Sequence, residues 1–370
     1  MLEEWSAGGM EYWSTGVMEY CKNEMPGRVP SECLFRPVIS RATRNLKVQS
    51  CWRISPFARN DIFIGKVSAR ISGLVAIGVL MILWAGAAPC ATFTDALGRE
   101  VVIPKTPRRI VPLAPSLTEI VYYLGLGDRV VGVTNHCNYP PEAALKPKVG
   151  SYINLNVERI ISLAPDLVIG TVDGNEKIVV ELLDQAGIPV YVVNPRDVRE
   201  AVETINLLGK VCALGEKGES LARALSARVN HVVEKTAALR KPLVFLQIDL
   251  HPIMSVNRRT IHHDLIRLAG GKNMTAEEPI TYPRISLEEV IQRKPDIILI
   301  SSMERGGRFE KAKEDWLKWT SIPAVRNGNV HLIDSDLIDR PSPRVVEGLE
   351  TMARLIHPEI EWSKTVGSKQ

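Results

Sequence analysis

Short apolar runs alternate with amphipathic segments along most of the chain from about residue 108. Four runs rich in branched side chains indicate strands: RIVPLA (109–114), RVVGVT (129–134), DLVIGT (166–171) and VYVV (190–193). Segments with helical period separate them at 116–126, 156–164 and 175–186. Uninterrupted apolar strands are typical of a parallel sheet that is covered on both faces. The alternation of strands and helices therefore predicts an α/β domain.

The alternation stops once, in the middle of the chain. Residues 197–240 carry two successive helical patterns and no strand, and the second, 216–239, would be roughly 36 Å long at about 1.5 Å per residue. Strands and helices then resume with VFLQID (244–249), a helix at 260–270, VHLID (330–334) and a final helix from Ser342. We therefore expect two Rossmann-like α/β lobes with parallel sheets, joined by a long backbone helix. The expected divisions are 92–213 for the N-terminal lobe, 214–240 for the linking helix, 241–357 for the C-terminal lobe and 358–370 for a tail.

The first predicted helix carries a capping-box pattern. Ser116 stands where an N-cap is expected, and Glu119 follows three residues later. At this spacing the two side chains can each bond a free backbone N–H group of the other residue. We therefore expect a capping box at the start of this helix.

Residues 151–170, SYINLNVERIISLAPDLVIG, are nearly repeated at 281–300, TYPRISLEEVIQRKPDIILI. The matched residues lie 130 positions apart and include Tyr152 with Tyr282, Glu158 with Glu288, and Pro165-Asp166 with Pro295-Asp296. In each copy a polar N-cap, Asn156 or Ser286, is expected to begin a helix that Pro-Asp ends before a buried strand. A glutamate beside a helix N-terminus is favourable, so a purely structural role for Glu158 and Glu288 stays open at this point.

The N-terminal part of the chain resembles a targeting signal. ISGLVAIGVLMILWAGAA (71–88) is an uncharged apolar run that follows Lys66 and Arg70 and precedes small residues. This order predicts a secretory signal peptide over 67–91, cleaved between about 87 and 93, and hence a periplasmic protein. An uncleaved membrane anchor and lipidation of Cys90 are the alternatives. Residues 1–66 would then be an over-long start or a disordered extension.

Composition excludes several classes of protein. Hydrophobic residues at 45% and charged residues at 24% are typical of a soluble globular chain. A net charge of +4 over 370 residues is too small to favour nucleic acid as a partner. Only Cys137 and Cys212 lie in the expected body, in a predicted loop and a predicted helix, and the chain has no zinc-type cysteine spacing. His262 and His263 diverge by about 100° on a helix, so they cannot share a metal, and we expect both to be solvated.

Nothing in the sequence indicates an enzyme. A nucleotide-binding α/β enzyme would need a glycine-rich phosphate loop after its first strand. PLAPSLTE (112–119) stands there instead. No Ser-His-Asp set, carboxylate pair or metal-ligand cluster is present in the sequence, so we expect a binding protein with no metal site and no cofactor of its own.

Long motifs resemble the substrate-binding proteins of ABC importers for cobalamin, haem and ferric siderophores. The first is DALGREVVIPKTPRRIVPLAPSLTEIVYYLGLGDRVVGV (95–133). NYPPEA (138–143), both copies of the repeat and SPRVV (342–346) are similar to the cobalamin-binding branch of that family. The resemblance runs from about 95 to 357 and implies two lobes on a rigid helical backbone, with the ligand in a cleft between them. The implied partners are a corrinoid ligand and an ABC permease and ATPase complex, with haem or a ferric siderophore as the alternative ligand. The protein would be a monomer that binds no nucleic acid.

The resemblance also implies roles for individual residues. Glu158 and Glu288 would each dock into arginines of the permease. The implied ligand contacts are His136, Tyr152, Thr171, Met254, Tyr282, Leu337, Ile338, Asp339 and Arg340. The two tyrosines keep flat aromatic faces for a large planar ligand. Thr171, Met254 and residues 337–338 stand where the family has aromatic residues, so the cleft would be more aliphatic and offer fewer surfaces for stacking. His136 could contact the corrin, ligate its metal or be solvated surface.

A siderophore site would favour several arginines in the cleft for an anionic ligand. Arg340 and Arg344 are the evident candidates in the sequence.

Overall fold

The computed structural model describes residues 90–301 and 308–362. The expected signal peptide, apart from its last two residues, and the 1–66 extension lie outside the described residues. The described chain begins with a hairpin that the sequence pattern did not predict, in which β1 (Cys90–Thr94) pairs antiparallel with β2 (Glu100–Pro104). It is held to the first lobe by Tyr191, whose hydroxyl donates to the Thr94 carbonyl at 3.0 Å.

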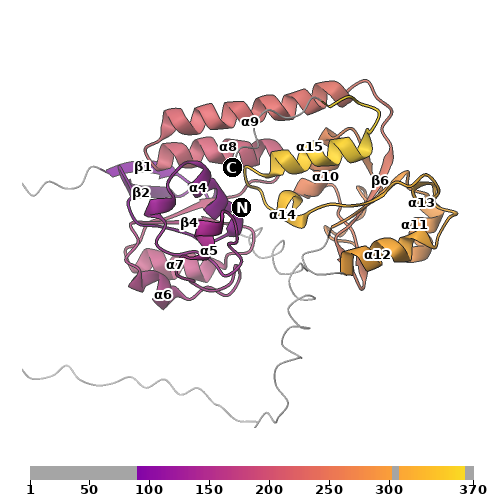
Figure 1. The fold of residues 1–370 in the computed structure, drawn as a ribbon. Helices are drawn as coiled ribbons and strands as arrows, with labels where there is room; N and C mark the ends of the chain where they lie inside the picture. Colours follow the sequence, from indigo (N-terminus) through magenta and orange to yellow (C-terminus); the bar gives the residue numbers. More distant parts are fainter. Residues whose placement is uncertain (1–89, 302–307, 363–370) are drawn as a thin grey trace, which may run out of the picture. The chain divides into compact units, whose positions relative to one another are not determined.

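The first lobe contains a three-stranded parallel sheet. Its strands are β3 (Ile110–Pro112), β4 (Leu167–Thr171) and β5 (Val190–Val193), in that spatial order. The accompanying helices are α4 (Pro115–Tyr123), η1 (Gly127–Arg129), α5 (Pro141–Ala144), α6 (Val157–Ser162) and α7 (Lys177–Gln185) (Figure 1). The expected strand over 129–134 is wrong: only isolated parallel bridges form there, Ile110 with Val130 and Val133 with Lys148.

The second lobe contains a four-stranded parallel sheet in the order β11-β10-β6-β9. These strands are β6 (Leu243–Gln247), β9 (Lys272–Asn273), β10 (Ile297–Ile300) and β11 (Val330–Leu332). A short hairpin joins β7 (Asp249–Leu250) to β8 (Ile253–Met254). The helices are α10 (Ile261–Leu268), α11 (Leu287–Arg293), α12 (Arg308–Leu317), α13 (Pro323–Arg326), α14 (Ser335–Ile338) and α15 (Val345–Ile356). The two parallel sheets confirm the predicted α/β class.

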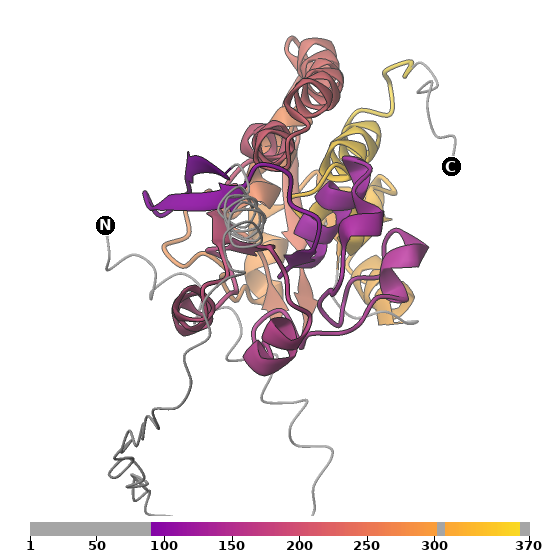
Figure 2. The same cartoon turned by 90° about the vertical axis from the view of Figure 1, so that its left-hand side faces the viewer.

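A helical layer connects the two sheets. α8 (Val198–Val211) and α9 (Gly215–Thr236) pack along each other, and α15 and α10 of the second lobe contact α9 as well. Figure 2 shows α8, α9 and α15 as neighbours, seen nearly along their axes. Leu225, Val229 and Val232 of α9 belong to one buried apolar cluster that takes residues from both sheets. Burial of this shared core is what holds the two lobes to the helical layer.

The close approach of α8 and α9 depends on two glycines. A Cβ on Gly218 would lie 2.9 Å from the Cα of Gly209 and 3.2 Å from the carbonyl oxygens of Ile205 and Asn206. Such contacts force the helices apart, which typically costs about 1–3 kcal/mol. A Cβ on Gly215, in the same helix, would meet only the Lys210 side chain at 3.6 Å, an ordinary contact.

We therefore expect Gly218→Ala to lower the free energy of unfolding by about 1–3 kcal/mol relative to Gly215→Ala. Gly215 is the first residue of α9 and Gly218 lies one turn inside it, so the helix-propensity gain favours Gly218→Ala and a net loss of stability in that variant reports packing. Urea denaturation followed by circular dichroism measures it. Equal stability of the two variants would mean that the helices can separate without cost.

Two local predictions fail at helix starts. The N-cap of α4 is Ala114, not Ser116, and Pro115 is the first helical residue. Pro is well suited to that position because it has no N–H to leave unsatisfied. The last helix begins at Val345 rather than Ser342; the Ser342 hydroxyl donates to a distant carboxylate, Glu119, at 2.7 Å and accepts from the Arg344 N–H at 3.2 Å.

Candidate functional site

The repeated Pro-Asp step has a structural role in both lobes. The Asp166 carboxylate accepts hydrogen bonds from the backbone N–H groups of Arg108 and Arg109, both at 2.8 Å, just before β3. The Asp296 carboxylate accepts from the N–H of Leu243, the first residue of β6, at 2.8 Å and from the Arg240 guanidinium at 3.0 Å. Each aspartate therefore ties the end of the repeat to the first sheet strand of its own lobe.

The repeated glutamates have no comparable local task. The predicted N-caps are confirmed, since Asn156 accepts from Arg159 N–H at 2.7 Å and Ser286 accepts from Glu289 N–H at 3.1 Å. Glu158 and Glu288 follow two residues after these caps, and both are exposed. Neither makes a hydrogen bond or ion pair with another residue of the part of the chain described here. Their carboxylates are therefore open to a partner molecule.

Tyr152 is held in place by the segment that follows β4. Its phenol donates to the Asp173 carbonyl, and its ring occupies the space that a Cβ on Gly174 would need. Gly174 also has φ +90°, a backbone conformation that favours glycine. The Asn175 side chain donates to the Tyr152 carbonyl at 3.0 Å and accepts from Thr171 N–H at 2.9 Å. The aromatic ring is thus positioned by its own lobe before any ligand arrives.

Tyr282, from the second copy of the repeat, lies near Tyr152. Burial raises the pKa of the Tyr152 phenol, and the Asp173 carboxylate and the Tyr282 phenol raise it further. Burial likewise raises the pKa of Tyr282, with Asp173 and Asp339 adding to the effect. Both rings are partly exposed and pack against the core cluster. The two tyrosines therefore share charged neighbours and pack against the same core cluster, which puts them in one region of the molecule.

A loop after α14 supplies the other groups of this region. Asp339 pairs with His262 through Nε2 at 2.7 Å, and His262 is buried, with an exposed fraction of 5%. The expectation that His262 is solvated is wrong, because α10 turns this side chain inward onto the loop. His263 is only partly buried, and burial lowers the pKa of its imidazole.

The remaining expected contacts differ in exposure. His136 is exposed, Leu337 packs partly buried against the core, and Ile338 is fully buried. Thr171 and Met254 are also buried. These buried side chains could contact a ligand only if the structure rearranged to expose them. The exposed and partly buried residues are therefore the stronger candidates for ligand contact.

Sequence reasoning missed a cross-lobe ion cluster centred on Glu119. This carboxylate, only 3% exposed on α4, accepts from Arg340 Nη1 at 2.9 Å, from Arg344 Nη2 at 2.7 Å and from the Ser342 hydroxyl. We call Glu119, Arg340, Ser342 and Arg344 the Glu119 cluster. The predicted capping box is wrong, since Glu119 bonds residues more than 220 positions away rather than its own helix start.

Further polar groups surround this cluster. Arg340 also bonds the Asn138 amide oxygen at 2.8 Å and pairs with Asp336 at 2.9 Å. The Arg344 guanidinium lies over the Tyr139 ring, 4.2 Å from its centroid, at a distance suited to a cation–π contact. The only sequence signal was the two arginines flanking Ser342 in RPSPR (340–344), and nothing local indicated their partner.

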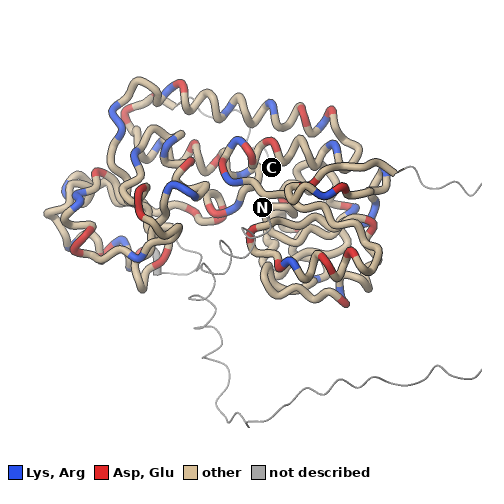
Figure 3. Tube along the Cα trace, turned by 180° about the vertical axis from the view of Figure 1, so that it is seen from behind, with Lys and Arg blue, Asp and Glu red and all other residues tan. Residues whose placement is uncertain are grey.

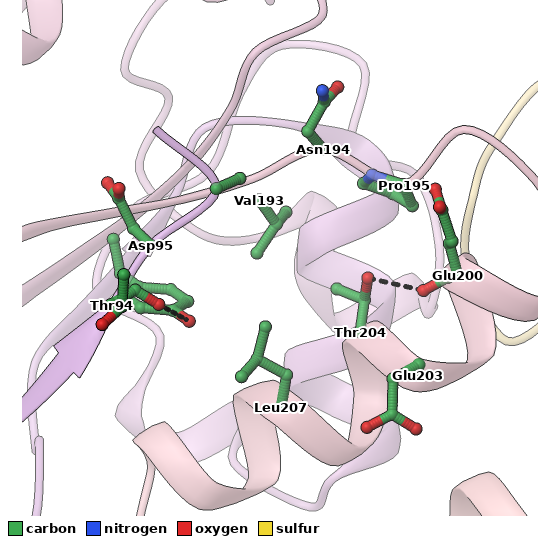
Figure 4. Close-up of a pocket in the computed structure, with 11 residues that line it drawn as sticks. Thr94, Asp95, Val193, Asn194, Pro195, Glu200, Glu203, Thr204 and Leu207 are labelled. Carbon is green, nitrogen blue, oxygen red and sulfur yellow. Dashed lines mark hydrogen bonds between the residues drawn. The ribbon is translucent and has the colours of Figure 1, made fainter. Parts of the chain in front are cut away.

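A separate hollow of about 300 Å³ lies on the first lobe alone (Figure 4). Its lining comes from 94–96, 193–195 and α8. Its polar groups are used internally: Thr204 Oγ donates to the Glu200 carbonyl at 2.8 Å, and burial raises the pKa of Tyr191, which bonds Thr94, to about 12. None of the expected ligand residues lines it, so it is not the candidate site.

Cysteines and metal-binding groups do not add a site. Cys137 is buried against the hydroxyls of Thr118 and Thr134, each at 3.1 Å, and Cys212 is buried with its thiol pKa raised to about 12 by burial. They are not joined in a disulfide. Over 90–301 and 308–362, no three His, Cys, Asp or Glu residues are grouped to hold a metal ion. No helix within those ranges is both long and apolar enough to cross a membrane.

Comparisons with known proteins agree with this architecture. The periplasmic binding protein family matches residues 110–337. An uncharacterized ABC transporter substrate-binding lipoprotein of Bacillus subtilis is 33% identical over 276 residues, which cover 72% of this chain and 86% of the relative. A vitamin B12-binding protein of Vibrio parahaemolyticus is 33% identical over 244 residues, covering 65% of this chain and 86% of the relative.

Solved structures show the same fold. The periplasmic vitamin B12-binding protein of Vibrio cholerae superposes with a TM-score of 0.62 at 28% identity, over 69% of this chain and 99% of that one. A periplasmic haem-binding protein from Roseiflexus sp. RS-1 superposes with a TM-score of 0.60 at 25% identity, over 68% of this chain and 98% of that one. The chain therefore belongs to the periplasmic binding protein family, whose members bind a substrate and are not enzymes.

Proposed function

We propose that this protein captures a corrinoid between its two lobes outside the cytoplasm and delivers it to the permease of an ABC transporter. The observation that carries the proposal is the convergence of Tyr152 and Tyr282, one from each copy of the repeat. Two aromatic faces from opposite lobes suit a large flat ligand, because stacking on such faces buries much apolar area. The vitamin B12-binding relatives support a corrinoid in particular.

The ligand class is tested by calorimetric titration of the exported protein with cyanocobalamin, dicyanocobinamide, haemin and a ferric siderophore. We expect one corrinoid per chain, with a dissociation constant in the nanomolar to micromolar range. Haem is the second candidate because a haem-binding protein shares the fold. Tight binding of haemin together with no binding of either corrinoid would decide for haem.

The tyrosines should contribute directly to affinity. Tyr152→Ala or Tyr282→Ala is expected to weaken corrinoid binding by about 1–3 kcal/mol, because an aromatic surface is lost. Tyr282→Phe keeps the ring and should bind nearly as well as the parent. Tyr123→Ala removes an exposed tyrosine on α4, outside this region, and is the control. Unchanged affinity in both alanine variants, measured by the same titration, would remove the tyrosines from the site.

We further propose that Glu158 and Glu288 are the two docking points for the permease. They occupy matching positions in the two lobes, are exposed, and have no ion-pair partner among the residues described here. A transporter with two equivalent permease subunits would require two equivalent contacts at matching places. Carboxylates suit such contacts because they form directional, bidentate bonds with arginine.

A further inference from the structure

The two arginines best placed to attract an anionic ligand are already neutralised. Arg340 and Arg344 both bond the buried Glu119 carboxylate, and Arg340 also pairs with Asp336 at 2.9 Å. Their side chains are only 15% and 16% exposed. A new carboxylate would have to compete with the bonds that both guanidiniums already make to Glu119 and that Arg340 makes to Asp336, and breaking such buried charge pairs is unfavourable.

The charges around the tyrosine pair point the same way. Two carboxylates, Asp173 and Asp339, act on the phenols of Tyr152 and Tyr282, against one guanidinium, Arg196. Asp339 lies directly before Arg340 of the Glu119 cluster in the loop after α14, and it is paired with His262. Together with Asp336, Glu119, Arg340 and Arg344, the region holds four carboxylates and three guanidiniums. Counting these carboxylates and guanidiniums alone, their formal charges sum to one negative charge.

We propose that this region selects against anionic ligands, and that Glu119, together with Asp336, sets this preference by balancing the charges of Arg340 and Arg344. The inference rests on the proposed function and narrows it to neutral or cationic ligands with amide rather than carboxylate side groups. Figure 3 shows basic and acidic residues interspersed along the described chain.

The expected effect is large enough to measure. When the effective dielectric constant is about 20, the repulsion between two like charges about 8 Å apart raises the dissociation constant roughly thirtyfold. Ligands that share one skeleton and differ only in charge isolate this effect from shape and stacking.

The test therefore compares matched corrinoids on the full exported protein by calorimetry. One pair is cyanocobalamin and its monocarboxylic acid, in which one side-chain amide is hydrolysed. The other is the heptaamide of dicyanocobyrinic acid and dicyanocobyrinic acid itself. In the parent protein we expect each acid to bind at least tenfold more weakly than its amide counterpart, and raising the salt concentration to narrow the difference.

Glu119→Gln then tests the assigned residue. It keeps the shape of the side chain but replaces one acceptor oxygen by an NH2 donor and removes the negative charge. The two guanidiniums are left with excess positive charge, so the acid forms should gain affinity relative to the amides. Glu350→Gln is the matched control: Glu350 is a mostly buried carboxylate that pairs with Arg228 at 2.8 Å and Arg354 at 3.7 Å, on α9 and α15. This control should leave the acid-to-amide ratio unchanged.

The outcomes separate this inference from the proposed function. Equal affinity of the parent protein for acid and amide forms would overturn the charge preference while corrinoid binding stands. Tight binding of haemin, which carries two carboxylates, with no corrinoid binding would overturn both. If Glu119→Gln fails to fold, the comparison on the parent protein still decides whether anionic ligands are rejected. A shift of the ratio in Glu350→Gln as large as that in Glu119→Gln would remove the assignment to Glu119.

Discussion

Glu119→Ala is expected to lower the free energy of unfolding by about 3–5 kcal/mol, because it leaves two largely buried guanidiniums without their shared carboxylate. The same change removes the hydrogen bonds that Ser342 and Arg340 donate to Glu119, and these bonds join the two lobes. Urea denaturation monitored by circular dichroism measures the loss.

Glu219→Ala is the control for this variant. Glu219 also pairs with an arginine, Arg223, but both side chains are exposed, at 59% and 74%. Exposed pairs on a helix contribute only about 0.3–0.5 kcal/mol, so this variant should unfold close to the parent. If Glu119→Ala also stays within about 1 kcal/mol of the parent, the cluster does not stabilise the contact between the lobes.

The double variant Glu158→Ala, Glu288→Ala is expected to lose most ligand uptake while binding ligand with unchanged affinity. Each carboxylate would lose its pairing with permease arginines, which costs about 2–5 kcal/mol for a buried pair and less at an exposed rim. Each single variant should lose part of the uptake, since one contact remains. The measurements are uptake in cells and ATP hydrolysis by the transporter stimulated by the loaded protein.

A matched control separates docking from helix stabilisation. Glu216 is also exposed and lies in the first turn of a helix, α9. If Glu158 and Glu288 act only through the helix dipole, the single alanine variants at Glu158, Glu288 and Glu216 should each lose a few tenths of a kcal/mol of folding stability and should all keep transport. Docking instead predicts that Glu216→Ala transports normally and the double variant does not. Normal transport by the double variant would show that neither glutamate is needed for docking.

Local sequence patterns were reliable where the physical cause is itself local. Asn156 and Ser286 were predicted as N-caps, and both accept the expected backbone bond, because a cap depends on residues three positions apart. The strand VYVV was predicted at 190–193, where β5 lies. The expected strand at 129–134 failed because its residues form only isolated bridges, and sheet pairing depends on neighbours that periodicity does not identify.

The candidate site was predictable only in part. The repeat pointed to Tyr152 and Tyr282 as equivalent residues, but only the folded chain shows that their phenols lie near each other. His262 looked like a solvated residue on an exposed helix face, yet its partner Asp339 lies 77 positions further along the chain. Glu119 fitted a local capping pattern so well that its true partners could not be suspected.

The sequence by itself determined the class of fold, the helix starts of the repeat and the family, because each follows from short-range periodicity, caps and ordered motifs. Only the tertiary structure decided where the charges go. Glu119 meets Arg340 and Arg344 across more than 220 residues of chain, and this pairing, together with the Arg340–Asp336 pair, offsets the charges of two apparent anion-binding residues. The physical reason is that a buried charge must be paired wherever the fold brings a partner within reach, and that distance in space is not written in the spacing of residues along the chain.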